Sequence, residues 1–122
     1  MKQALTGEDL TVYGDGEQTR SFCYVSDMID GLVTLLHSGV DEPVNIGNPD
    51  ERSILNLAEV IREVTDSESN ITHEERPPQD PEIRRPDISK ARSKLEWTPN
   101  VSLRDGLHQS IPYFESQLQL SR

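Results

Sequence analysis

Three arginines occupy positions in the chain where a bound anion could meet them. Arg20 lies between a glycine turn and an aromatic segment, and Arg84 and Arg85 come directly before Pro86. A guanidinium group presents a planar fork of donors that matches phosphate oxygens, so arginines that converge from separate loops would clamp a diphosphate. Each could instead pair with one of the 22 acidic side chains. Charge alone favours the ion-pair interpretation.

Other site chemistries lack their motifs. The three histidines are far apart in the sequence and show no metal-ligand spacing, so no metal is expected (His37, His73, His108). No Gly-x-Ser-x-Gly elbow supports a nucleophilic triad. Gly14-x-Gly16 lacks the third glycine of a dinucleotide fingerprint, because that position is Thr19, and we expect a turn there.

The Tyr-x-x-x-Lys pair of short-chain dehydrogenases is also absent. The residues four positions after the three tyrosines are Glu17, Met28 and Gln117. The chain alone is therefore not expected to bind NAD or to begin hydride chemistry.

Composition narrows the class of protein further. The net charge of −10 argues against a nucleic-acid reader, because phosphate neutralisation needs a basic face. No apolar run approaches the roughly 18 residues of a membrane span, and no signal-peptide stretch follows Met1. Cys23 is the single cysteine, and its neighbours Phe22 and Tyr24 predict a buried, inert thiol. A reducing, cytoplasmic compartment is expected.

The elements that must position the arginines can be predicted from apolar periodicity and breakers. The pattern indicates an α/β (α+β-like) small lobe of three to four helices with a few short strands. Helical segments are expected at 1–6 (a helix tail), 27–39, 53–65, 89–97 and 102–118, and strands at 10–13, 20–25, 43–47 and 71–74.

Several polar residues are expected to cap these helices. Ser53 and the pair Ser102 and Asp105 are predicted caps of the second and last helices. The first helix is expected to be capped by Ser26 or Asp27, and the short third helix by Asp87 or Ser89. Pro112 should kink or shorten the last helix, because it removes a backbone donor.

Four segments resemble, in order, landmarks of the extended short-chain dehydrogenases that act on nucleotide sugars, the NAD-dependent sugar epimerase/dehydratase family. They are residues 10–27 (LTVYGDGEQTRSFCYVSD), 44–49 (VNIGNP), 80–91 (DPEIRRPDISKA) and 95–99 (LEWTP). Ser21 after Arg20, together with the Arg-Arg-Pro-Asp run, is most similar to the UDP-glucuronate decarboxylase (UDP-xylose synthase) branch.

The resemblance implies a substrate-binding role for particular residues. Arg20 corresponds to an arginine that meets the diphosphate and, in the decarboxylases, lies near the reacting sugar. Arg84 matches a second nucleotide-contacting arginine, and Arg85 stands where Lys is frequent. Tyr13 and the backbone at Val12 match a strand that lies against the base and ribose, where a ring can stack and main-chain groups can read a polar edge.

The resemblance also implies that residues 1–122 are a C-terminal sugar-nucleotide-binding domain without the N-terminal, NAD-binding Rossmann half. The intact enzyme would oxidise the sugar at C4 with NAD, lose the C6 carboxylate and reduce the ketone to give UDP-xylose. This chain would supply substrate binding and one electrostatic contact, from Arg20. It would dock on the Rossmann half, or self-associate through surfaces left bare, or persist as a marginally stable monomer.

Two other classes of function remain open at this point. One is a free-standing nucleotide-sugar-binding or regulatory module, and the other is a pure interaction domain whose arginines are solvated. The base, whether uracil, thymine or guanine, and the choice between decarboxylation, dehydration and epimerisation are left open as well.

Overall fold

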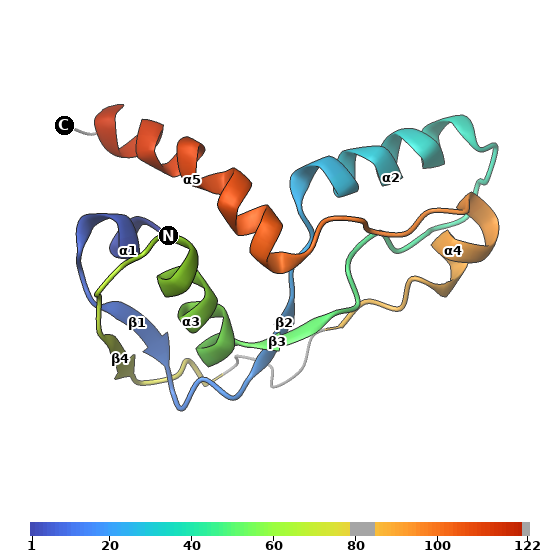
Figure 1. Ribbon diagram of the computed structural model, residues 1–122. Coiled ribbons are helices and arrows are strands. Elements are labelled where there is room, and N and C mark those ends of the chain that lie inside the picture. Colours follow the sequence, from blue (N-terminus) through green and yellow to red (C-terminus); the bar gives the residue numbers. More distant parts are fainter. Residues whose placement is uncertain (79–84, 121–122) are drawn as a thin grey trace.

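The computed structural model describes residues 1–78 and 85–120, in which five helices and four short strands form two groups on either side of a small central ladder (Figure 1). The first group contains α1 (Lys2–Thr6), β1 (Leu10–Tyr13), α3 (Ile54–Val64), β4 (Ile71–Glu74) and α5 (Leu103–Leu120). The second contains α2 (Val25–His37) and α4 (Ser89–Leu95), and the central ladder is β2 (Thr19–Ser21) with β3 (Glu51–Ser53). The predicted fold class is confirmed, and each of the expected helical segments, including the helix tail at 1–6, contains a helix.

The first group is built on a parallel pair of strands. β1 pairs with β4 in a register that sets Leu10 opposite Ile71 and Val12 opposite His73. The inward face of β1 packs against α1 and α3, and these apolar contacts form the first core cluster. Its buried members are Ala4, Leu10, Val12 and Ala58.

The second group packs around the only tryptophan of the sequence, Trp97. Helix α2 reaches this cluster through Gly31, where a Cβ atom would lie 2.6 Å from Ile46 Cγ2 and 3.1 Å from Trp97 Cε2. Any larger side chain would push α2 away, so close packing here requires glycine. The buried members of this second core cluster are Ile88, Ala91, Leu95 and Trp97.

Two of the predicted strands differ from the structure: one is shorter than expected, and the other is absent. The strand expected at 20–25 ends at Ser21, and helix α2 already begins at Val25. Residues 43–47 form no strand, although Val44 and Ile46 pack against the second cluster. A strand needs a ladder of backbone hydrogen bonds with a neighbour, and no strand among the described residues pairs with this segment. Strand β3 was not predicted, because Glu51-Arg52-Ser53 carries no apolar alternation.

Two of the four predicted helix caps are confirmed. Ser53 Oγ accepts a hydrogen bond from Asn56 N at 3.0 Å, and Ser102 Oγ accepts one from Asp105 N at 3.1 Å. The expected caps of α2 and α4 are wrong: their N-cap residues are Tyr24 and Ile88, without a side-chain hydrogen bond.

Asp27 and Asp87 have other tasks. Asp27 is buried and accepts hydrogen bonds from Asn100 N at 3.1 Å and Val101 N at 2.9 Å, so it ties α2 to the segment before α5. Asp87 forms a turn with Ser89 at the start of α4.

Helix α5 continues through Pro112 to Leu120, so the proline does not shorten it. Of the helices in the described ranges, none is both long enough and apolar enough to cross a membrane.

Replacing Asp27 with Ala should lower the free energy of unfolding by about 1–3 kcal/mol, because two backbone amides would lose the buried carboxylate that accepts their hydrogen bonds. Asp30→Ala removes an exposed carboxylate from the same helix and should change it by less than about 0.5 kcal/mol. Urea unfolding followed by circular dichroism measures both. Equal losses in the two variants would contradict the assigned role of Asp27.

Candidate functional site

The carboxyl end of β1 carries the residues expected to meet the base. The Tyr13 ring is 49% exposed, whereas Val12 is 1% exposed and belongs to the first core cluster. Hydrogen bonds from Leu10 N to Asn70 O and from Gly14 N to Glu74 O flank Val12 on the β4 side. By ladder alternation the backbone groups of Val12 also face β4, and those of Tyr13 face the opposite edge.

The Tyr13-Gly14 peptide is held from several directions. Gln18 Nε2 donates to Tyr13 O at 2.9 Å, and His73 Nδ1 lies 2.7 Å from Gly14 O. Gly14 N donates to Glu74 O at 2.7 Å. These contacts fix the backbone at the end of β1, from which the Tyr13 side chain projects.

Gly14-Asp15-Gly16 forms the expected turn, with φ of 66° at Gly14 and 78° at Gly16. A Cβ at Gly16 would lie 2.9 Å from Val12 Cγ1 and 3.0 Å from Leu55 Cβ, so core side chains occupy the space beside the turn. Strand β2 follows the turn, whereas a dinucleotide loop opens a helix. The described residues therefore do not fit NAD at this Gly-x-Gly run.

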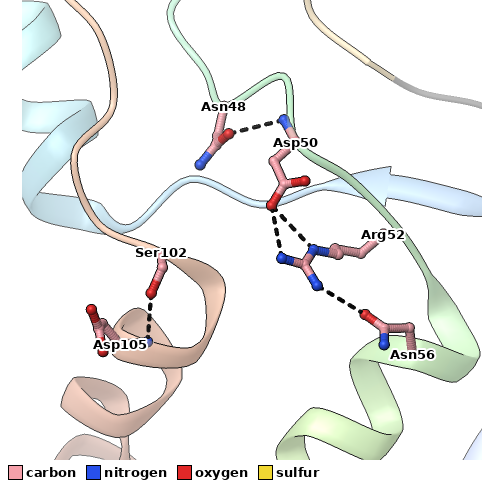
Figure 2. Close-up of polar contacts among 6 residues, drawn as sticks. All are labelled: Asn48, Asp50, Arg52, Asn56, Ser102 and Asp105. Carbon is pink, nitrogen blue, oxygen red and sulfur yellow. Dashed lines mark hydrogen bonds and ion pairs between the residues drawn. The ribbon is translucent and has the colours of Figure 1, made fainter.

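Arg20 lies in the central ladder directly opposite Arg52. Residues directly opposite in an antiparallel pair project from the same face, so two guanidinium groups share this face. Arg20 Nη1 donates to Thr19 O at 2.6 Å. Figure 2 shows Arg52 held at 3.1 Å by Asp50 and at 3.4 Å by Asn56 Oδ1, while Asn48 Oδ1 accepts from Asp50 N at 2.9 Å.

Arg85 reaches the same ladder from the other half of the chain. Its Nε lies 3.5 Å from Glu51 Oε1, its side chain is 61% exposed, and Glu51 stands opposite Ser21 in the ladder. A hollow of about 320 Å³ lies beside it. The hollow is lined by Pro49, Arg85, Pro86, Asp87, Ile88, Ser89 and Arg92.

The structure thus places Arg85 at the β2–β3 ladder that carries Arg20, while Arg84 lies outside the described residues. Arg52 was not singled out from the sequence, because it lies outside the four segments that resemble family landmarks. Arg52 pairs with Asp50, and Arg85 pairs with Glu51. Successive residues of a strand point to opposite faces, so Glu51, the partner of Arg85, points away from the face that carries Arg20 and Arg52. A phosphate bound beside Arg20 would therefore compete with Asp50 for Arg52.

Asp87 lies two residues after Arg85 and lines the same hollow. Hydrogen bonds from the Ser89 hydroxyl and then the Ser89 amide lower the pKa of its carboxyl, and Arg85 and Arg92 lower it further. Asp87 therefore stays ionised at neutral pH and orders the start of α4, which is a structural task.

An apolar hollow of about 290 Å³ lies in the first group, between α3, α5 and the segment after β2. None of the predicted substrate-binding residues lines it, but Cys23 does, together with Phe22, Leu57 and Phe114. Burial, and then the negative charge of Asp27, raises the pKa of the Cys23 thiol. The thiol is half-buried and protonated at neutral pH, as expected for an inert cysteine.

The chain belongs to the family described as GDP-mannose 4,6 dehydratase, whose sequence model matches residues 1–110. This confirms the resemblance to the NAD-dependent sugar epimerase/dehydratase enzymes.

Characterised relatives point to one branch of this family. UDP-glucuronic acid decarboxylase 1 of Danio rerio is 50% identical over 117 residues, which are 96% of this chain and 28% of that protein. UDP-glucuronic acid decarboxylase 3 of Arabidopsis thaliana is 48% identical over 120 residues, or 98% of this chain and 35% of that protein. The chain thus spans about a third of the length of these relatives.

Solved structures agree in fold. UDP-glucose 4-epimerase of Thermotoga maritima, solved with UDP-glucose, superposes with a TM-score of 0.90 at 30% identity and covers 96% of this chain and 38% of that one. UDP-glucuronic acid 4-epimerase of Bacillus cereus, in complex with UDP-glucuronic acid and NAD, gives 0.88 at 34% identity and covers 95% and 38%.

Alkylation of Cys23 by iodoacetamide should be slower in the folded protein than in urea, because burial and Asp27 disfavour the thiolate. The rate should rise only at a pH above the ordinary thiol pKa of about 8.5. Asp27→Asn should move this rise to lower pH, since one negative charge is removed. Quenched reactions analysed by mass spectrometry give the rates, and equal rates in folded and unfolded protein would contradict the interpretation.

Proposed function

We propose that the chain is the nucleotide-sugar-binding part of an NAD-dependent enzyme that acts on a UDP-sugar. The observation that carries this proposal is the approach of base-side and phosphate-side residues to one another. Gln18 bonds to the Tyr13 carbonyl, Arg20 follows two residues later, and Arg85 reaches the same ladder through Glu51. A ring at the end of β1, a turn, and guanidinium groups at the ladder that follows suit a base, a ribose and a diphosphate in that order.

The relatives favour uracil as the base and a glucuronic acid as the sugar. Identity near 50% to the decarboxylases exceeds the 34% to the UDP-glucuronic acid 4-epimerase, so decarboxylation is the reaction we assign to the whole enzyme. Arg20 would contact the diphosphate and the adjoining sugar. We place the NAD-binding Rossmann half outside residues 1–122, which lack the glycine fingerprint and the Tyr-x-x-x-Lys pair, and we assign to this chain the binding of the substrate.

Arg20→Met should weaken UDP binding about tenfold, because one charge-assisted contact to the diphosphate is lost. Arg104→Met removes the same charge from α5, where Arg104 pairs with Glu63, and should leave the affinity within about twofold of the wild type. Chemical-shift titration with UDP, which measures millimolar dissociation constants, compares the three proteins. A folded wild-type protein that shows no shifts with UDP would refute the proposed function.

Helix α2 supports a second role for the chain, as a docking module. Four apolar side chains that recur at helical spacing are each more than half exposed: Val25, Ile29, Leu32 and Leu36. Leu36 is 78% exposed. An apolar stripe of this kind marks an interface, and we propose that it packs on the Rossmann half. Without that half, the stripe would drive self-association.

Leu36→Glu should therefore shift the protein from larger assemblies toward the monomer without loss of the fold, because the residue makes few internal contacts. Tyr113→Glu alters a comparably exposed ring on α5, 61% exposed, and should leave the assembly state unchanged. Sedimentation velocity over a concentration series distinguishes them. A wild-type protein that stays monomeric at every concentration would remove self-association from the proposal.

A further inference from the structure

Gln18 is an almost fully buried polar residue to which neither the expected site nor the family comparison assigns a task. Its side chain is 2% exposed, and its Nε2 donates to Tyr13 O at 2.9 Å. Its own carbonyl accepts from Ile54 N at 3.0 Å, which anchors it to the first residue of α3. A buried amide with partners on two elements holds those elements in one arrangement.

The position of Gln18 in the chain gives this contact a consequence for the site. Arg20 lies two residues further on, within about 7.6 Å of Gln18 Cα by the spacing of consecutive Cα atoms. Backbone hydrogen bonds hold the turn between Tyr13 and Gln18 at two points, from Gly14 N to Glu74 O and from Leu55 N to Gly16 O. The side chain of Gln18 adds the direct link from the end of this turn back to Tyr13.

We propose that Gln18 is a positioning residue that fixes the Tyr13 ring relative to the Arg20 guanidinium, so that both ends of a nucleoside diphosphate are met at once. The inference rests on the proposed function and adds to it the residue that couples the two halves of the site. Binding two ends of one ligand gains most when the contacting groups are already at the correct separation. Without the Gln18 contact, Tyr13 can still meet the base and Arg20 the diphosphate, but the two contacts seldom form at the same time.

The chain offers a matched control in Gln3. Its Nε2 donates to Thr11 Oγ1 at 2.7 Å, and its Oε1 accepts from Thr11 N at 3.1 Å. Gln3 thus bonds the same edge of β1 two residues before Tyr13, but it comes from α1 and has no connection to β2. Its loss removes support from the strand and leaves the link between Tyr13 and Arg20 in place.

The test compares UDP affinity in the wild type, Gln18→Met, Gln18→Glu and Gln3→Met by chemical-shift titration of the full chain. Methionine keeps the length of the side chain without a donor, and a carboxylate replaces the donor with an acceptor, so the two variants remove the contact to Tyr13 O in different ways. Circular dichroism confirms folding at the temperature of the titration. We expect Gln18 variants to bind UDP at least about fivefold more weakly and Gln3→Met to stay within about twofold.

The variant Arg20→Met combined with Gln18→Met separates positioning from general loosening. In the Arg20→Met background, the Gln18 substitution should cost less than about twofold, because the partner that it positions is already gone. Three outcomes would each overturn this inference alone. They are a folded Gln18 variant with wild-type affinity for UDP, a Gln3 variant that loses as much affinity as the Gln18 variants, and an undiminished effect of the Gln18 substitution in the Arg20→Met background. A wild-type protein that binds no UDP would overturn the proposed function with it.

Discussion

Three residue pairs between β2 and β3 hold the two groups of elements in place and set the geometry of the site. Because Arg20 stands opposite Arg52, their like charges would repel if no carboxylate were close by, and Asp50, the residue before β3, meets that need through its ion pair with Arg52. Glu51, which points to the other face, pairs with Arg85. A single short pairing thus places Arg20, Arg52 and, through Glu51, Arg85 at one ladder.

Much of the fold could be predicted because its local signals are strong. The alternation at 10–13 and 71–74 and the Ser53 cap gave β1, β4 and the start of α3, since each depends on neighbours in the sequence. The wrong strand predictions concern segments whose structure depends on pairing with a strand that is distant in the sequence. Residues 43–47 have the apolar character of a strand without a described partner, and charged β3 is a strand only because β2 lies beside it. Asp27 looked like a cap, but two backbone amides from the segment before α5 bury it.

The site could be predicted only in part for the same reason. Motif resemblance singled out Tyr13, Arg20 and Arg85, which lie in recognisable runs of sequence. It gave no sign of Arg52, which lies outside the four segments that resemble family landmarks and pairs with Asp50, two residues before it. Val12 was selected for its backbone, yet its place in the ladder turns that backbone toward β4. A motif identifies side chains. The edge of the strand toward which a peptide group points depends on the register of strand pairing, which the motif does not contain.

The two core clusters have no residue in common, and this division affects how the molecule unfolds. Separate clusters linked by a short ladder can open at different free energies, so a two-state description is not guaranteed. The single indole, at Trp97, reports the cluster around α4, while far-ultraviolet dichroism averages both. Fluorescence and dichroism melting curves would therefore diverge. A ligand that touches residues of both groups would draw the curves together, because its binding energy is lost when either group opens.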